Sequence, residues 1–412
     1  MARHRTKNTD FTRDRTLTFP TLMLHGLNLI KGSAQQELDN TLQLIHADAT
    51  RRQRVTQSAF TQARQKFSHN AFIEINQKVV EHFYQQSDIK TWHGFRLCAI
   101  DGSQLRLPNE AAVIKEFGVR NGRCSQREVP MALTSIYYDV LNQIVIDAGI
   151  FPSDRHERHC VQQHLLQARP NDLILLDRGY PAFWLYTLLE QQKLAFCMRA
   201  RTRLDLNVKT FLRSRKKQAI IEIAPTRKAI MKCHERQLPT TPVKLRLIRV
   251  KLKTETEVLI TNLLDEEHYP AEIFKDLYHQ RWHIEEQYKR QKQWLEIENF
   301  SGRSVHAIRQ DFHAKQVTNN LTAMLTHASQ KQMATKQSPR QHTYKINFAQ
   351  GLSKMKDSVV LLLLNHDLAQ RIKKLLQYFS QTVEAVRKDR HFKRRMSNLH
   401  HNLHHMAYKA CR

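Results

Sequence analysis

Four polar residues in the C-terminal half of the chain are spaced so that they would share one face of a helix. They are Tyr278, Arg281, Glu285 and Lys292, with the last three at offsets of 3, 7 and 14 residues from the first. At about 100° per residue, all four fall within a wedge of about 60°. A carboxylate in this setting can bind a metal ion while the cations and the phenol hold a phosphate beside it. The alternative is an ordinary surface helix on which Arg281 and Glu285 form an i, i+4 ion pair.

Two further acids each follow a short apolar run that is typical of a buried strand. The run Phe95–Ile100 leads to Asp101, and Leu173–Leu176 leads to Asp177. A hairpin is expected between them, over residues 132–150, followed by a helix from His156. Three antiparallel strands, a helix and a strand beside the first are the opening of an RNase H-like fold. We therefore expect Asp101 and Asp177 to meet.

Glu285, the third acid, is predicted to lie on a long helix. The pattern predicts one helix from about Pro270 to about Glu298, stopped by Asn299, Ser301 and Gly302. Glu286 falls at about 80° from Tyr278 and outside the polar wedge. An adjacent stripe of the helix is apolar and would be buried; it contains Ile273, Leu277, Ile284, Tyr288 and Leu295.

Together these motifs resemble those of a known family. The spacing Tyr-x2-Arg-x3-Glu-x6-Lys is the signature of the DDE transposases of bacterial insertion sequences, in the insertion-sequence-four group, and this chain matches it at every position. Asp101-Gly102-Ser103 is similar to the family's first acidic motif, and Asp177-Arg178-Gly179-Tyr180 to its second. The resemblance covers roughly residues 95 to 300.

The resemblance implies a reaction and its residues. Asp101, Asp177 and Glu285 would be metal ligands for two Mg²⁺ or Mn²⁺ ions, about 4 Å apart, that support an in-line displacement at phosphorus. Water would first nick the DNA, and the freed 3′-OH would attack target DNA. Tyr278, Arg281 and Lys292 would bind phosphates near the cut end. The implied partners are double-stranded DNA, as terminal inverted repeats and target, and a second copy of the chain in the DNA-bound complex.

One feature departs from the family pattern. Members that cut the second strand through a DNA hairpin stack a flipped base on a tryptophan in the β-rich insertion, but the tryptophans here (Trp92, Trp184, Trp282, Trp294) lie outside it. Phe211 is the insertion's only large aromatic residue.

The expected fold class is α/β. An RNase H-like core, with a mixed five-stranded sheet and helices, is interrupted by a β-rich insertion and flanked by helical regions. The expected divisions are a helical DNA-binding region (1–90), the first part of the core (91–202), the insertion (203–263), the core helix with Glu285 (264–302) and a helical C-terminal region with a basic tail (303–412).

The charge of the chain favours a polyanionic partner. Its 66 Lys and Arg against 38 Asp and Glu give a formal charge of +28. The longest apolar run, Val359–Leu364, is far shorter than the ~20 residues of a membrane span. The basic N-terminus lacks the apolar segment of a secretory signal. We expect a protein of the cytosol, associated with the nucleoid when bound to DNA.

Three acid-poor stretches are candidate DNA contacts. Residues 49–73 contain no Asp or Glu, and a helix from about Thr56 would turn Gln57, Thr61, Arg64 and Gln65 outward, as in a helix-turn-helix reader. In the insertion, cations at Lys244, Arg246, Arg249, Lys251 and Lys253 would form one face of a strand. The third stretch is residues 387–412. Solvated basic surfaces are the plainer interpretation of all three.

Two other functions remain open at this point. An RNase H-like endonuclease would share the metal chemistry without strand transfer. A non-catalytic DNA-binding protein descended from a transposase would retain the fold alone.

Overall fold

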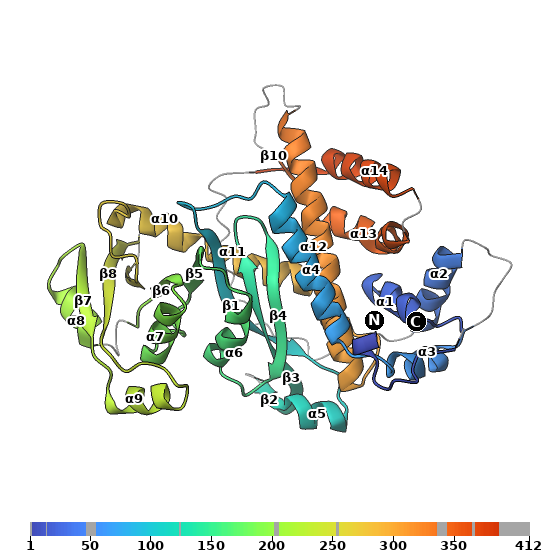
Figure 1. Ribbon diagram of the computed structural model, residues 1–412, viewed down its shortest axis with the longest axis horizontal. Coiled ribbons are helices and arrows are strands. Elements are labelled where there is room, and N and C mark those ends of the chain that lie inside the picture. The colour runs from blue at the N-terminus through green and yellow to red at the C-terminus, as the bar shows by residue number, and fades with distance from the viewer. Residues whose placement is uncertain are drawn as a thin grey trace.

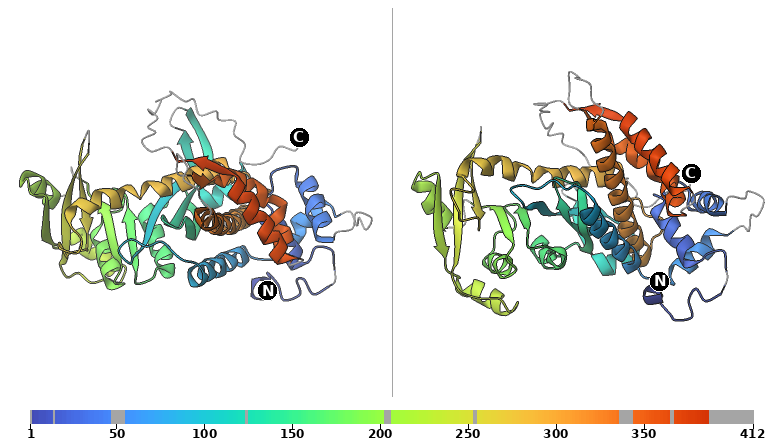
Figure 2. Two further views of the ribbon diagram at one scale, coloured as in Figure 1. Left: turned by 90° about the horizontal axis from the view of Figure 1, so that it is seen from above. Right: turned by 45° about the horizontal axis from the view of Figure 1, so that its top comes forward.

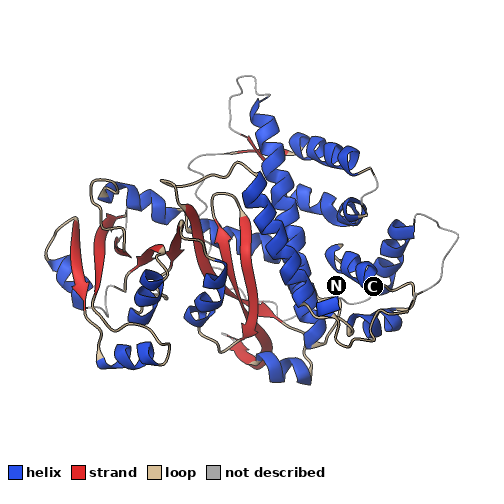
Figure 3. Cartoon of the chain, in the orientation of Figure 1, coloured by secondary structure: helices blue, strands red, loops and turns tan. Residues whose placement is uncertain are grey.

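The computed structural model describes residues 2–13, 15–46, 55–122, 125–201, 206–252, 255–335, 344–364 and 367–386. A large mixed sheet occupies one part of the molecule, and helices pack on its faces and beside it (Figure 3). The fold is therefore mixed α/β.

Four helices come first along the chain, followed by the strands and helices of the sheet. The helices are α1 (Phe19–Leu27), α2 (Ala34–His46), α3 (Gln57–Arg64) and α4 (Asn70–Gln86). The next segment contains β1 (Arg96–Arg106), α5 (Ala111–Phe117), β2 (Val119–Gly122), β3 (Ser125–Asp139), β4 (Ile144–Pro152), α6 (Glu157–His164), β5 (Asp172–Leu176), α7 (Phe183–Gln191) and β6 (Ala195–Arg199).

The second half of the chain completes the sheet and then becomes helical. It contains α8 (Leu206–Arg213), β7 (Gln218–Ile223), α9 (Arg227–His234), β8 (Val243–Lys251), β9 (Thr256–Thr261), α10 (Phe274–His279), α11 (Trp282–Gln293), α12 (Val305–Thr335), β10 (Tyr344–Ile346), α13 (Phe348–Leu363), α14 (Leu368–Gln381) and β11 (Val383–Ala385). Short 3₁₀ turns cover Ala2–His4, Leu165–Gln167 and Ala271–Ile273.

The strand order places β1 at the centre of the expected core. β1 pairs antiparallel with β3 and parallel with β5, β3 pairs antiparallel with β4, and β5 pairs parallel with β6. The hairpin and the neighbouring first and fourth strands are therefore present as predicted. β1 is longer than expected, because it continues past Asp101 to Arg106.

The sheet is larger than the five strands predicted for the core, because the strands of the β-rich insertion extend it. Strand β9 of the insertion pairs antiparallel with β6, and β8 and β7 follow, so the described strands 1 to 9 form one continuous sheet. Antiparallel addition to the free edge of β6 pairs that strand's backbone groups and covers an exposed sheet edge.

Alternating side chains along β1 build a core on each face of the sheet. Leu97 and Ala99 belong to one buried cluster, and Cys98 and Ile100 belong to the other. The first cluster also contains residues of α10 and α11, and the second contains residues of α6 and α7. Because successive strand residues point to opposite faces, odd-numbered positions of β1 face α11.

The 31-residue helix α12 joins the sheet to the remaining helices. It runs beside α4 and along β4 (Figure 1). The Asn320 amide group donates to Asn76 of α4 at 2.8 Å and to the carbonyl of Val145 in β4 at 2.7 Å, and its oxygen accepts the Val145 N–H at 2.9 Å. None of the described helices is long and apolar enough to cross a membrane.

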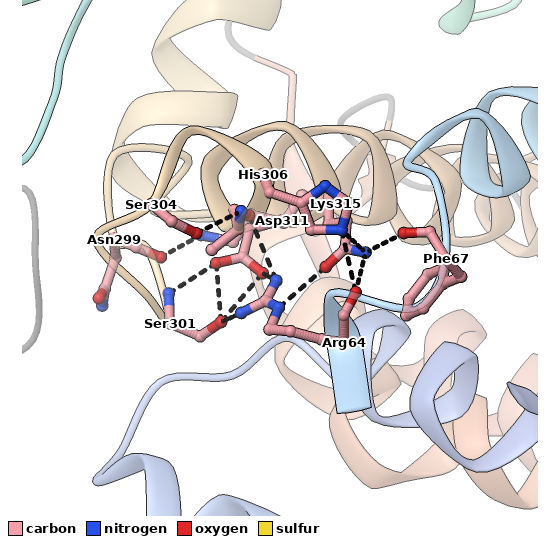
Figure 4. A network of polar contacts seen from close by, with 10 residues as sticks. Arg64, Phe67, Asn299, Ser301, Ser304, His306, Asp311 and Lys315 are labelled. Carbon is pink, nitrogen blue, oxygen red and sulfur yellow. Dashed lines mark hydrogen bonds and ion pairs between the residues drawn. The ribbon is translucent and has the colours of Figure 1, made fainter. Parts of the chain in front are cut away.

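Arg64 has a structural position that differs from the one predicted. The sequence pattern turned it outward toward DNA, but its side chain is buried between α3 and α12 (Figure 4). It donates to Asp311 at 2.8 Å, to Gln310 at 2.8 Å and to Ser301 at 2.8 Å. The error arose because helical periodicity does not show which surface a second helix covers. Thr61 and Gln65 are exposed as predicted. Arg51, Arg52 and Arg54, the other arginines of the acid-poor stretch 49–73, lie outside the described residues.

We expect Arg64→Ala to lower the free energy of unfolding by about 3–5 kcal/mol, because it leaves the Asp311 carboxylate buried without its partner. The control is Arg303→Ala, which removes an exposed ion pair with Glu110 and should cost no more than about 1 kcal/mol. Urea unfolding of both variants is the measurement. Equal losses in the two variants would contradict the structural role of Arg64.

Candidate active site

The pairing of β1 with β5 determines where the two strand acids lie. Ala99 and Leu175 are the last paired residues of the parallel ladder, and Asp101 and Asp177 each follow two positions later. Burial raises the pKa of Asp101 to about 7, and the neighbouring carboxylates of Asp177 and Glu157 add to the rise, while the Gly102 N–H and Arg281 oppose it. Asp101 and Asp177 therefore lie within electrostatic range of each other.

Main-chain N–H groups within each motif orient these carboxylates. Gly102 N–H donates to Asp101 Oδ1 at 2.9 Å, and Gly179 N–H donates to Asp177 Oδ1 at 2.6 Å. A Cβ at residue 179 would lie only 2.8 Å from that Asp177 oxygen, so a larger residue would displace the carboxylate from this position. One oxygen of each carboxylate is thus held by the main chain of its own motif.

The sequence predicts one continuous helix around Glu285, but the structure has two, α10 and α11. α10 ends at His279 and α11 begins at Trp282, and the N–H groups of Gln280 and Arg281 bond to carbonyls three residues back rather than four. α11 also ends earlier than predicted, at Gln293. Figure 2 shows the two helices running across the sheet toward α12.

Arg281 connects the helix acid to the first strand acid. Its guanidinium group lies 2.9 Å from Glu285 Oε1 and 3.7 Å from Asp101 Oδ2. The side chains of Asp101 and Glu285 remain 18% and 30% exposed, so both can be reached from solvent. Glu286 is exposed on another part of α11.

Three further side chains fasten α10 and α11 to the strands that carry the acids. Tyr278 Oη donates to the carbonyl of Leu176 at 3.2 Å, and Lys292 Nζ donates to the carbonyl of Gln104 at 2.8 Å. Tyr288 Oη donates to the carbonyl of Asp101 itself at 2.7 Å. Burial lowers the pKa of Lys292. The helical pattern predicts Tyr288 only as part of the buried apolar stripe, so its hydrogen bond is an additional role.

A buried Ser-His-Asp arrangement lies beneath Asp101 and was not foreseen. His164 lies 2.7 Å from Asp147 and 2.9 Å from Ser135 Oγ, and Ser135 is paired with Gly102 in the sheet. Ser135 and His164 are completely buried. No substrate can reach this serine, so the group supports β1 rather than acting as a nucleophile.

Glu157 and Tyr180 also lie near the acids. Burial raises the pKa of Glu157, and the Asp177 carboxylate adds to the rise. Tyr180 is completely buried, and among the described residues its hydroxyl has no hydrogen-bond partner. The sequence motifs did not indicate that Glu157 lies near the acids, because it is the first residue of α6 and belongs to none of the three motifs.

The donor set suits a hard cation, since carboxylate oxygens are the ligands that Mg²⁺ and Mn²⁺ prefer. Arg281 already supplies positive charge to Asp101 and Glu285, and the Tyr180 hydroxyl is unpaired. Within the described residues, however, no three acidic, His or Cys side chains are gathered as a ready-made metal site. Side chains would have to move before three of these carboxylates could contact one cation.

The aromatic residue of the insertion is unavailable to DNA. Phe211 is buried, with the Arg249 guanidinium 5.4 Å from its ring centre. Arg246 was predicted on an open cationic face but is buried against α10, with its guanidinium 5.3 Å from the Phe274 ring centre. Lys244 and Lys251 are exposed, and Lys253 lies outside the described residues.

Comparison with known families identifies the chain. The family model described as "Transposase DDE domain" matches residues 92–321, which include all three acids and the sheet that carries them. The chain belongs to this transposase family.

Two individual proteins are similar to this DDE-domain chain. The transposase InsG for insertion sequence element IS4 of Escherichia coli (strain K12) is 26% identical over 266 residues, which are 61% of this chain and 56% of InsG. The chain thus matches little more than half the length of that relative. A cryo-EM structure of the piggyBac transposase synaptic complex with hairpin DNA has a TM-score of 0.42 and 11% identity, covering 88% of this chain and 79% of that one.

Proposed function

We propose that this chain binds the terminal inverted repeats of an insertion sequence, cleaves DNA strands with the help of divalent metal ions, and joins the resulting 3′-OH to target DNA. In this proposal β4, β3, β1, β5 and β6 form an RNase H-like core, and Asp101, Asp177 and Glu285 are the metal ligands. The observation that supports it most strongly is that Arg281 contacts both Glu285 and Asp101. Asp101 in turn lies within electrostatic range of Asp177.

Two Mg²⁺ or Mn²⁺ ions would supply Lewis acidity for the attacking and leaving oxygens. The chain's own residues would provide the geometry. Tyr288 and Tyr278 hold the main chain at Asp101 and directly before Asp177, so the two acids keep their separation when DNA enters. Arg281 would exchange a carboxylate for a DNA phosphate, for which its planar donors are suited.

Lys292 is the second cation that would grip DNA near the cut end. Its ammonium group donates to a backbone carbonyl of β1, three residues beyond Asp101. A carbonyl is a neutral acceptor, so a phosphate oxygen could replace it with a gain in electrostatic attraction. We further propose that two copies of the chain act together on the element ends, in the cytosol and on nucleoid DNA.

We expect Glu285→Gln to reduce metal-dependent nicking of element-end DNA by at least about 100-fold, because it keeps the shape of the side chain but removes a ligand charge. Binding in a gel-shift assay should be nearly unchanged. Glu286→Gln is the matched control on the same helix and should nick normally. Lys292→Ala should weaken DNA binding and leave part of the cleavage, since the acids remain.

If Glu286→Gln is inactive and Glu285→Gln is active, the assignment of Glu285 as the metal ligand is wrong. A plasmid-joining assay run in parallel tests strand transfer. Nicking without any joined product would favour the endonuclease function over transposition.

The sheet register predicts which insertion cation lies nearest to the DNA path. Paired residues place Ala99, Leu175, Cys197, Thr261 and Arg246 at one level across the sheet. β8 runs in the same direction as β1, because two antiparallel pairings separate it from β6. Lys251 therefore lies at the end of the sheet where Asp101 and Asp177 are found, and Lys244 lies toward the other end.

We expect Lys251→Gln to make the slope of log K against log salt shallower by roughly 0.9 for binding to element-end DNA, because one phosphate contact is lost. Lys244→Gln removes another exposed charge from the same strand and should leave the slope nearly unchanged. Fluorescence anisotropy over a series of salt concentrations is the measurement. A larger change for Lys244→Gln would place the DNA on the opposite end of the sheet.

A further inference from the structure

Glu157, the first residue of α6, lies against the backbone of β1 next to Asp101. A Cβ added at Gly102 would lie 2.7 Å from its Cγ, 2.8 Å from its Cδ and 2.9 Å from its Oε1. A side chain at residue 102 would therefore exclude this carboxylate from its position. The glycine of the Asp-Gly-Ser motif thus leaves room for the side chain of Glu157, which lies 55 positions later in the chain.

The approach is from the face of the sheet opposite to α11. Ile100 of β1 belongs to the same buried cluster as Val161 and Leu165, which follow Glu157 in α6 and the turn after it. Asp101 is at an odd-numbered position of β1 and faces the other way. Glu157 and Glu285 thus approach the two strand acids from opposite sides.

Glu157 has basic neighbours, Arg120 and His156, but no ion pair with a basic side chain among the described residues. Asp177 and Asp101 are both among its electrostatic neighbours, and Arg120, which attracts it, donates to the carbonyl of Ser153 instead. Among the described residues, neither Glu157 nor Asp177 forms an ion pair with a basic side chain, whereas Arg281 serves Asp101 and Glu285. Carboxylates gathered without a cation repel one another.

The hydroxyl of Tyr180 provides an independent sign of a missing ligand. It is completely buried and lacks a hydrogen-bond partner, and its electrostatic neighbours are Asp101, Glu157, Tyr288 and Asp177. A buried hydroxyl without a partner is unfavourable, so such a group usually faces an unseen water or ion. A water molecule bound to a cation between these acids would give it an acceptor.

We propose that Glu157 is a fourth carboxylate of the metal site, and that with Asp177 it helps to hold a divalent cation of the Mg²⁺ or Mn²⁺ class, directly or through a bound water. This inference rests on the proposed function, since it adds a ligand to the same site. Glu157 supplies the face of β1 that Glu285 does not reach, so the strand acids are flanked by a carboxylate on each side.

The test is Mn²⁺ binding by the full-length chain without DNA, followed by the electron paramagnetic resonance signal of free Mn²⁺. Glu157→Gln should weaken binding of at least one ion about 10- to 100-fold. Gly102→Ala should have a similar effect while keeping the glutamate, because its Cβ displaces the carboxylate. The two changes combined should be no worse than either alone. Circular dichroism establishes that each variant is folded.

Asp154→Asn is the matched control, because it removes an exposed acid three residues before Glu157 and should bind Mn²⁺ like the unaltered chain. Asp177→Asn tests the proposed function separately. If Asp177→Asn weakens binding but Glu157→Gln does not, the role of Glu157 is overturned and the three-acid site stands. If the unaltered chain binds no Mn²⁺, both proposals fail.

Discussion

Parallel pairing of β1 with β5 ends two residues before each strand acid, and the candidate site depends on this register. Adjacent strands are about 4.8 Å apart, so the pairing brings together two side chains that are distant in sequence. A shift of one residue in either strand would turn its acid to the other face of the sheet. Both faces of β1 are apolar and buried, so apolar residues alone do not distinguish one register from the next. Arg96 and Asp172, which are paired in this ladder, also form a buried ion pair at 2.6 Å that is specific to the observed register.

Polar contacts then position α11 over the strand ends. Tyr278, Tyr288 and Lys292 donate to carbonyls of β5 or β1, and Arg281 adds an ion pair with Asp101. Behind α11, buried amides pair it with α12: Gln287 with Asn319 at 3.1 Å, and Gln291 with Gln316 at 2.9 Å. Hydrogen bonds have fixed partners, unlike apolar contacts, so they specify how the helix is rotated and not only that it is buried.

Much of this arrangement could be predicted because it follows local patterns. Apolar runs located the strands that precede Asp101 and Asp177, and helical spacing grouped Arg281 with Glu285. The failures concern long-range packing. Arg64 and Arg246 were assigned to open faces, but α12 and α10 cover them, and no periodicity within one element shows what packs against it. The break at Gln280 and Arg281 was missed because both residues are compatible with a continuous helix. Glu157 and Ser135 acquire their positions only when the sheet forms.

We propose above that Asp101, Asp177 and Glu285 bind the catalytic metal ions. Anomalous diffraction at the manganese edge, from crystals of this chain grown with Mn²⁺, measures this most directly. We expect strong anomalous peaks within about 2.5 Å of oxygens from all three carboxylates, with the Arg281 guanidinium displaced from at least one of them. Peaks confined to other parts of the chain, with Arg281 still between Asp101 and Glu285, would contradict it.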